Sequence, residues 1–418
     1  MLLLQCLSLF LAFLSNYVLL KLVGVSDYGQ YVYVFNFIYL LVNFCLIGTD
    51  TLVIRNIPVY EISKDHKMQK GVIFFSIAAA FLGSIIMSFV SEIFVQFTPI
   101  SKNIGSIYWF LLVVISLPML SVTVIIQSAL QGERKIALSQ FAEKIIKPGI
   151  IIIAVLLLFF FEKEISFSKL ITINLVAIGV TLLITFIFYQ QHVGARLKNV
   201  RPVFEIGNWK NSAAAFFLIG MLYIINSRID IVLLGVFKGN RDVGVYNIVL
   251  KISEIIGFVL AIVNLIISPV IAKLYTAGDM LQLRQLMTRS AQIVLICGFP
   301  LFLLIVIFRN YILSFFGVNF SGGDHAMIIL ASGQMINILC GSVGTLLIMT
   351  GYQKFSLFSL AVGMVFNIML NILLTPRLGL LGTAIATASS LAIWNLLMLL
   401  FVRRKLKVFF HPFKLFRA

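Results

Sequence analysis

Apolar runs of about twenty residues follow one another along nearly the whole chain, with short polar segments between them. An α-helix rises about 1.5 Å per residue, so a run of this length crosses the roughly 30 Å hydrocarbon core of a bilayer. The pattern therefore predicts twelve membrane-spanning helices, at residues 2–20, 31–54, 71–91, 106–130, 145–161, 170–189, 211–236, 244–272, 290–308, 325–349, 355–375 and 379–402.

The second half of the chain repeats the first. Asp27–Tyr31 (DYGQY) returns as Asp242–Tyr246 (DVGVY), an offset of 215 (242 − 27). Gly132–Lys135 (GERK) returns as Gly351–Lys354 (GYQK), an offset of 219 (351 − 132). A nearly constant offset predicts two similar lobes with a site between them. Each lobe holds six predicted spans, an even number, so the two copies are expected to run in the same direction.

We therefore predict an all-α polytopic membrane protein built from two parallel six-helix bundles. The N-terminal lobe is expected at residues 1–195, and a cytoplasmic linker at 196–210. The C-terminal lobe is expected at 211–402, followed by a basic cytoplasmic tail at 403–418.

Composition supports a membrane protein and sets its orientation. Hydrophobic residues make up 61% of the chain and charged residues 11%, whereas about a quarter of the residues of a soluble domain are charged. Of the 32 Lys and Arg residues, we assign 22, among them Lys147, to the membrane face that carries both termini and 8 to the opposite face. Because basic loops resist translocation, both termini are predicted to be cytoplasmic. The net charge of +17 is then an orientation signal, and nucleic-acid binding is not expected.

The sequence lacks the signatures of several other classes of protein. No G-x-x-x-x-G-K-[ST] phosphate-binding loop occurs, so nucleotide hydrolysis by that route is not expected. The four cysteines fall within predicted spans and the four histidines have no ligand spacing, so we predict no metal and no cofactor. The predicted aqueous loops are short, which disfavours a membrane glycosyltransferase or polymerase.

Four charged residues, Arg228, Asp230, Lys251 and Glu254, lie inside the seventh and eighth predicted spans. Inserting a charge near the bilayer centre costs about 2.5–3.5 kcal/mol of free energy on insertion scales, so each of these charges is expected to have a compensating partner or a function. One hypothesis is that Arg228 and Lys251 line a cavity between the lobes and bind phosphate or pyrophosphate, for which Arg offers a bidentate fork. Asp230 or Glu254 would then tune the site or carry a coupling proton. The alternative for Lys251 and Glu254, three residues apart on one helix, is mutual neutralisation.

Two more charges, Asp50 and Arg55, lie near the cytoplasmic end of the second predicted span. Arg55 is a candidate for substrate binding at the mouth of the cavity; the alternative is an interfacial anchor that reaches the headgroups. Asp50 joins the candidates for coupling or for tuning the site.

Polar residues in the spans are expected either to bind sugar hydroxyls or to hold helices together. They include Gln127, Asn264, Gln334, Asn337, Asn367 and Asn371.

The order of these landmarks resembles that of the polysaccharide-export flippases, the Wzx-type branch of the multidrug/oligosaccharidyl-lipid/polysaccharide exporter superfamily. The similar segments are Leu22–Gly24 with Asp27–Tyr31, Asp230–Gly235 with Val243–Tyr246, Asn367–Asn371 with Thr375 and Pro376, and Gly379–Ala384. The resemblance implies two six-helix bundles that form a V around a central cavity. Members of this family often carry cationic residues that face the cavity, and Arg228 and Lys251 are the positions here that fit.

By this resemblance, the leading hypothesis is a flippase for undecaprenyl-pyrophosphate-linked oligosaccharide repeat units of O-antigen or a similar surface polysaccharide. It would translocate these repeat units across the bacterial cytoplasmic membrane by alternating access. Its partners would be the lipid-linked oligosaccharide, membrane lipid, a polysaccharide polymerase and a chain-length regulator. The main alternative is a cation-coupled multidrug or small-molecule antiporter of the same superfamily. A peptidoglycan-precursor flippase is a third hypothesis, although that branch commonly carries extra spans, and a membrane glycosyltransferase or polymerase is a fourth.

Overall fold

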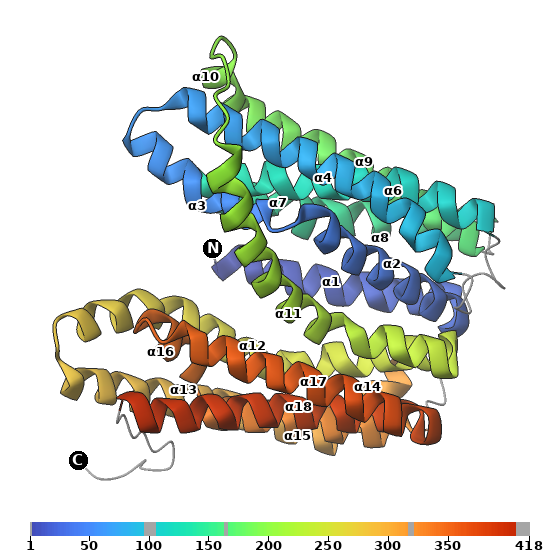
Figure 1. Ribbon diagram of the computed structural model, residues 1–418. Coiled ribbons are helices and arrows are strands. Elements are labelled where there is room, and N and C mark those ends of the chain that lie inside the picture. The colour runs from blue at the N-terminus through green and yellow to red at the C-terminus, as the bar shows by residue number, and fades with distance from the viewer. Residues whose placement is uncertain (1, 96–105, 163–165, 317–321, 407–418) are drawn as a thin grey trace. The chain divides into compact units, whose positions relative to one another are not determined.

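The computed structural model describes residues 2–95, 106–162, 166–316 and 322–406, and the elements in these ranges are helices (Figure 1). The chain divides into two compact units, Met1–Arg228 and Ile229–Ala418, which are described separately. Of the predicted basic tail, residues 407–418 lie outside the described part of the chain. The predicted lobe boundaries at 195 and 211 stay predictions.

The described part of the first unit contains eleven helical segments and the start of a twelfth. They are α1 (Leu2–Val23), α2 (Val25–Leu46), α3 (Thr49–Ile62), α4 (His66–Val95), α6 (Ser106–Gly132), α7 (Ile136–Phe141), the π-helix η1 (Ala142–Ile146), α8 (Lys147–Glu162), α9 (Phe167–Tyr189), the π-helix η2 (Gln190–Gly194), α10 (Ala195–Leu197) and the first part of α11 (Ile206–Lys238). Within this unit α4 packs on α6, α6 packs on α9, and α8 packs on both α1 and α9.

The second unit contains the end of α11 and eight further helical segments. They are α12 (Asn240–Thr276), α13 (Met280–Ile307), α14 (Arg309–Phe315), α15 (Gly323–Cys340), α16 (Val343–Met349), α17 (Gln353–Leu378), α18 (Leu380–Phe401) and the π-helix η3 (Val402–Leu406). Here α18 packs on α17 and α15, and α12 packs on α13 and α15.

The number of spans differs from the predicted twelve. In the described residues, nine helices are long and apolar enough to cross a membrane, or eleven if each of two bent pairs is one span. The first predicted span contributes only the shorter apolar helix Leu7–Val23. The protein is thus a multi-pass helical membrane protein, and the exact twelve-span count is not confirmed.

The boundaries of two pairs of helical segments are separated by nearly the same offset as the sequence repeat. α2 and α3 together cover 25–62 and α12 covers 240–276, offsets of 215 (240 − 25) at the start and 214 (276 − 62) at the end. α6 covers 106–132 and the pair α15–α16 covers 323–349, an offset of 217 at both ends (323 − 106, 349 − 132). These two pairs of segments therefore keep the offset of the sequence repeat, although the helix is broken in a different copy of each pair.

One such break corrects the sequence analysis, which placed a single helix at 31–54. α2 ends at Leu46 and α3 begins at Thr49, because Ile47 and Gly48 are left-handed, with φ of 50° and 73°. Positive φ cannot continue a right-handed helix. As a result, Asp50 and Arg55 lie on α3 and not at the end of the second span.

Gly48→Ala is expected to destabilise the first unit. Left-handed backbone costs a non-glycine residue about 1–2 kcal/mol. An added Cβ would also lie 2.3 Å from the Ala213 carbonyl oxygen and 2.5 Å from the Phe217 nitrogen, both backbone atoms of α11. We expect a loss of at least about 2 kcal/mol, measured as a lower melting temperature in detergent. Gly149→Ala is the matched control, since its Cβ meets nothing within 4 Å. Equal melting of the Gly48 variant and wild type would contradict the close approach.

Residues 196–210, predicted to form a cytoplasmic linker, include the end of α10 and the first turn of α11, and they are bound to one end of the first unit. The Val203 N–H donates to the Lys67 carbonyl at 3.1 Å, and the Trp209 indole donates to the Tyr60 hydroxyl at 3.1 Å. Trp209 is 2% exposed. A free linker would leave such a large side chain in water, so this segment is part of the packed unit.

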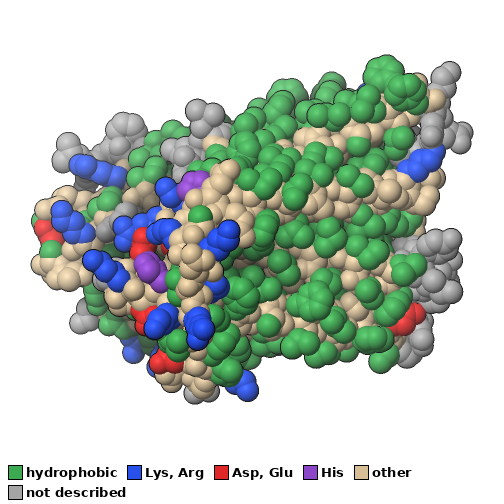
Figure 2. All heavy atoms as spheres, turned by 90° about the horizontal axis from the view of Figure 1, so that it is seen from above, with side chains coloured by type: hydrophobic (Ala, Val, Ile, Leu, Met, Phe, Trp, Pro, Cys, Tyr) green, Lys and Arg blue, Asp and Glu red, His purple; other side chains and the backbone are tan. Residues whose placement is uncertain are grey.

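Basic residues gather at this same end. Seven exposed ones come from the segments that join α3 to α4, α6 to α7 and η2 to α11: Lys64, Lys67, Arg134, Lys135, Arg196, Lys198 and Arg201. On the face shown in Figure 2, most Lys and Arg side chains lie towards one end and hydrophobic side chains cover the helical flanks. This end of the first unit is therefore basic, and the cytoplasmic orientation inferred from the count of Lys and Arg stays a prediction.

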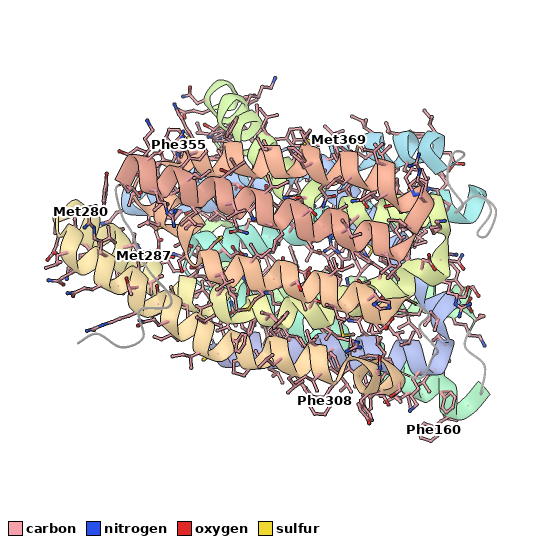
Figure 3. The ribbon with its side chains drawn as sticks, turned by 90° about the horizontal axis from the view of Figure 1, so that it is seen from below. Phe160, Met280, Met287, Phe308, Phe355 and Met369 are labelled. Carbon is pink, nitrogen blue, oxygen red and sulfur yellow. The ribbon has the colours of Figure 1, made fainter. Side chains whose placement is uncertain are left out.

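A cluster of buried hydrophobic side chains lies at one end of the second unit. Its fully buried members include Ile271 on α12, Met287 on α13 and Leu347 on α16, and Phe355 on α17 packs against it (Figure 3). The outer side of α17 is apolar as well, since Met369 is 45% exposed. Exposed apolar flanks around a packed interior are typical of helices in contact with lipid.

Candidate functional site

Arg228, predicted to bind substrate, is held by α2 of the first unit. Its Nη1 donates a hydrogen bond to Oδ1 of Asn36, and its guanidinium lies 5.6 Å from the centroid of the Tyr39 ring. Both partners are neutral, so neither of them cancels the positive charge. An arginine placed in this way within an apolar helix is available to an anion.

A second cation meets the same tyrosine. Lys147, the first residue of α8, is 7% exposed, and its ammonium donates to the Tyr39 hydroxyl. The Lys147 nitrogen lies 4.9 Å from the centroid of the Tyr39 ring. Tyr39 therefore holds two positively charged side chains, Lys147 from α8 and Arg228 from α11, close to one aromatic ring.

The sequence analysis missed Lys147, which it counted among the charges at the cytoplasmic face. One structural signal points to it. Lys147 lies inside the continuous helix Ile136–Phe161, directly after the π-helix η1, and π-helical turns are frequent at functional sites.

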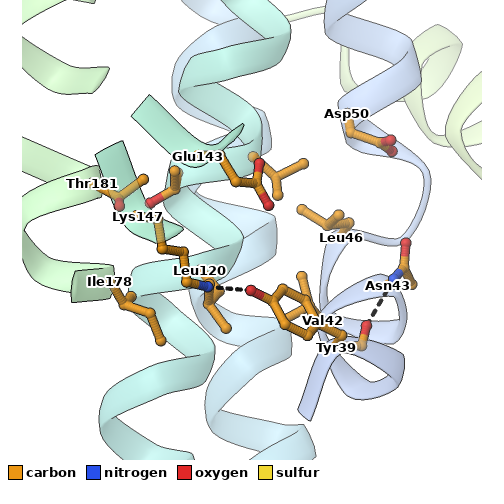
Figure 4. A pocket seen from close by; sticks show the side chains of 12 residues that line it. Tyr39, Val42, Asn43, Leu46, Asp50, Leu120, Glu143, Lys147, Ile178 and Thr181 are labelled. Atoms are coloured by element: carbon orange, nitrogen blue, oxygen red, sulfur yellow. Dashed lines mark hydrogen bonds between the residues drawn. The ribbon is translucent and has the colours of Figure 1, made fainter. Parts of the chain in front are cut away.

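Lys147 lines a small cavity of about 120 Å³ inside the first unit. Figure 4 shows Lys147 reaching Tyr39, with the carboxylates of Asp50 and Glu143 on other sides of the cavity. The remaining lining residues are Val42, Asn43, Leu46, Leu120, Thr123, Val124, Ile178 and Thr181. The cavity is well above the 10–15 Å³ or so that holds one water, so it has room for water with a phosphoryl group or a small cation.

The other predicted site residues lie elsewhere. Arg55 is exposed on α3, where its guanidinium lies 5.7 Å from the Phe216 ring, and it is not among the residues that line the cavity. Lys251 donates to Glu254 at 2.7 Å, and their side chains are 46% and 45% exposed. The pairing of Lys251 with Glu254 that was left open as an alternative is therefore present.

Lys251→Ala is expected to have a small effect. An exposed pair three residues apart on a helix stabilises by roughly 0.2–0.5 kcal/mol, and solvent screening lowers this further. We expect transport within about twofold of wild type and an unchanged melting temperature. If Lys251→Ala instead loses transport while Glu254→Ala does not, Lys251 binds substrate.

Asp230 lies in the second unit and is 2% exposed. Its Oδ2 accepts hydrogen bonds from the hydroxyls of Tyr246 at 2.7 Å and Thr387 at 3.3 Å, and its Oδ1 accepts from the Ile231 N–H at 2.8 Å. These hydrogen bonds join the end of α11 to α12 and α18, which is a structural role, and the coupling or tuning role of Asp230 stays a prediction.

Buried polar side chains continue from Thr387 along α17 and α18. Ser390 donates to the Thr387 carbonyl at 2.9 Å and accepts from Asn367 at 3.1 Å. Asn371 donates to the Asn367 side chain at 2.9 Å and accepts from Thr375 at 2.9 Å. Asn367 and Asn371 are 1% and 0% exposed, so they bind other protein groups rather than a sugar: Asn367 joins α17 to Ser390 of α18, and Asn371 bonds within α17. In the described part of the chain, no group of three or more His, Cys, Asp and Glu could hold a metal ion.

The fold is that of membrane transporters. The chain is similar to the lipid II flippase MurJ in an inward closed conformation, with a TM-score of 0.75, 16% identity, and coverage of 96% of this chain and 88% of that one. It is also similar to an inward-facing MATE multidrug transporter of the MOP superfamily, with a TM-score of 0.69, 16% identity, and coverage of 96% and 94%. At these identities the similarity establishes the fold.

Sequence families identify the chain more closely. Residues 1–275 match the family model "Polysaccharide biosynthesis protein", and residues 215–373 match the MatE family model. The first match covers well over half of the chain, so the protein belongs to the polysaccharide biosynthesis protein family. This confirms the resemblance to polysaccharide flippases inferred from the sequence motifs.

Two relatives come from Haloferax volcanii. The chain is 24% identical over 197 residues to "Probable low-salt glycan biosynthesis flippase Agl15", a match that spans 47% of this chain and 40% of the relative. It is 25% identical over 177 residues to "Probable flippase AglR", spanning 41% of this chain and 37% of the relative. The matched stretch thus covers less than half of either relative.

Proposed function

We propose that this protein is a transporter that moves a lipid-linked oligosaccharide across the membrane by alternating access. The substrate would be an undecaprenyl-pyrophosphate-linked repeat unit of O-antigen or a similar surface polysaccharide, as for the Wzx-type branch of the family. The observation that carries the proposal is the pair of cations, Lys147 and Arg228, that meet at Tyr39 in the first unit.

The chemistry of these two cations suits a diphosphate. Both sit in an apolar helical unit and their hydrogen-bond partners are neutral, so a bound anion gains free energy from them even though Asp50 and Glu143 line the cavity of Lys147. The Arg228 guanidinium offers a planar fork for phosphate oxygens, and the Lys147 ammonium acts as a point charge. Their present partners, Asn36 and the Tyr39 hydroxyl, are neutral and would be exchanged for phosphate oxygens.

The carboxylates of the cavity would make binding reversible. Asp50 and Glu143 line the same cavity as Lys147, so a bound diphosphate would feel their repulsion. This lowers affinity and favours release on the far side of the membrane. Asp50, Asp230 and Glu254 are the proposed coupling or tuning groups. Arg55 and Lys251, both exposed, are proposed only as weak outer contacts for substrate, whose loss changes transport by no more than about twofold.

In this proposal, two six-helix lobes, at residues 1–195 and 211–402, form a V around a central cavity and rock against each other. The protein would lie in the bacterial cytoplasmic membrane with both termini in the cytoplasm, consistent with the basic loops. A polysaccharide polymerase and a chain-length regulator are proposed as partners.

The second candidate function is a cation-coupled antiporter for small molecules. The observation that favours it is the presence of two carboxylates, Asp50 and Glu143, in one cavity with the polar side chains of Asn43, Thr123 and Thr181. Resistance to cationic drugs on overexpression, with normal surface polysaccharide in a deletion strain, would support this function over the first.

A deletion strain tests the proposal in cells. We expect complete lipid-linked repeat units to accumulate on the cytoplasmic leaflet and surface polysaccharide to be lost, both restored by the gene. Altered glycan chain length with normal translocation would indicate a polymerase, and normal glycan without accumulation would reject the flippase.

A further inference from the structure

A second and larger cavity opens on the flank of the first unit. It has a volume of about 550 Å³ and lies between α8 and α9. Most of its lining is apolar: Ile150, Ala154, Leu157, Leu158, Phe161, Ile173 and Val176. Three polar residues, Ser168, Lys169 and Thr172, line it where α9 begins. We call this cavity the α8–α9 groove.

The groove continues from the cation site along one face of α8. Lys147, Ile150, Ala154, Leu157 and Phe161 follow at intervals of three or four residues, the spacing of one helix face. α8 and α9 also form walls of the small cavity that Lys147 lines. One helix face therefore presents a buried ammonium at its start and a hydrocarbon surface after it.

The length of the groove suits a hydrocarbon chain. From Ile150 to Phe161 the helix rises through eleven residues, or about 16 Å. This is about half of the roughly 30 Å hydrocarbon core of a bilayer. The groove is bounded by one helix pair, α8 and α9.

We infer that the α8–α9 groove binds the isoprenoid tail of the substrate while Lys147 binds its diphosphate. This inference rests on the proposed function. The groove lies on the outer side of Lys147 if the basic end of the unit faces the cytoplasm, so a bound lipid has its headgroup inward and its tail outward. That is the orientation of a lipid in the cytoplasmic leaflet, where the flippase must load it.

The groove also explains how the long tail of the substrate can stay outside the polar interior of the protein while the headgroup enters it. Phe161 and Leu157 are 83% and 52% exposed, so the groove is open to lipid along its length. The tail enters sideways from the bilayer, and only the diphosphate and the sugars pass into the interior.

Filling the groove tests this role. We expect Ala154→Trp to slow flipping of a polyprenyl-diphosphate oligosaccharide at least tenfold in reconstituted vesicles. The same variant should flip an analogue with a one-isoprene tail as fast as wild type does, because that tail is shorter than the rise of about 10 Å from Lys147 to Ala154. Ile153→Trp is the matched control: Ile153 is 61% exposed, does not line the groove, and its replacement should leave both substrates unaffected.

Equal rates for Ala154→Trp and wild type with the long-tail substrate would overturn the inference, and so would equal loss with both substrates. Should Ala154→Trp fail to fold, a benzophenone amino acid at position 157, with position 153 as control, tests the same point. Photocapture of the polyprenyl lipid at Leu157 and not at Ile153 supports the groove; capture of phospholipid alone rejects it. A wild-type protein that flips neither substrate would reject the proposed function itself.

Discussion

Arg228→Glu is expected to abolish flipping while leaving the amount of protein in the membrane unchanged. The substitution replaces the guanidinium beside Asn36 and Tyr39 with a carboxylate, which repels the diphosphate that the site is proposed to bind. A change from attraction to repulsion in an apolar interior amounts to several kcal/mol, and each 1.36 kcal/mol or so is tenfold in rate. We therefore expect at least a hundredfold slower flipping.

The measurement is surface polysaccharide in a deletion strain that carries the variant, with membrane protein quantified in parallel. Lys198→Glu is the control, because Lys198 is exposed at the basic end and outside the site. Arg228→Lys keeps the charge but loses the fork, so it should retain part of the activity. Normal polysaccharide in the Arg228→Glu strain would remove Arg228 from the site.

Lys147→Met should separate function from stability. Lys147 is 7% exposed, and replacing a buried charge with an apolar side chain of similar volume is often neutral or stabilising. We expect a melting temperature equal to or above that of wild type, together with flipping at least tenfold slower. A lysine with a merely structural role would give the opposite pattern, with a lower melting temperature and normal flipping.

The two cations should depend on Tyr39 in different ways. Tyr39→Phe removes the hydroxyl that accepts from Lys147 but keeps the ring beside Arg228. We expect Tyr39→Phe to change the effect of Lys147→Met and to leave the effect of Arg228→Glu nearly as it is in wild type. Additive effects of Tyr39→Phe and Lys147→Met would mean that the hydroxyl does not position Lys147.

The helical architecture could be predicted from the sequence because it depends on hydrophobicity and repetition. A run of apolar residues must satisfy its own backbone in a membrane, and only a helix does so within one segment. The repeat was visible in Asp27–Tyr31 and Asp242–Tyr246, and it returns in the boundaries of α2–α3 and α12. The break at Ile47 and Gly48 was not visible, because it depends on the approach of the α11 backbone to Gly48.

The site was predicted only in part, for a similar reason. Arg228 stood out because it is charged within an apolar run, whereas Lys147 lies next to other basic residues at the edge of one and resembles an orientation charge. Its burial depends on Tyr39, more than a hundred residues earlier in the chain. Lys251 also stood out, yet its neighbour Glu254 pairs with it on an exposed face.

The most direct test of the account is flipping by the purified protein in vesicles. A polyprenyl-diphosphate oligosaccharide with a fluorescent sugar is placed in both leaflets, and a membrane-impermeant quencher reports the outer fraction over time. The account predicts that wild type exposes the inner pool within minutes and that Arg228→Glu and Lys147→Met leave it protected, as in protein-free vesicles. Equal protection with wild type and with empty vesicles, or equal exposure with all three proteins, would contradict it.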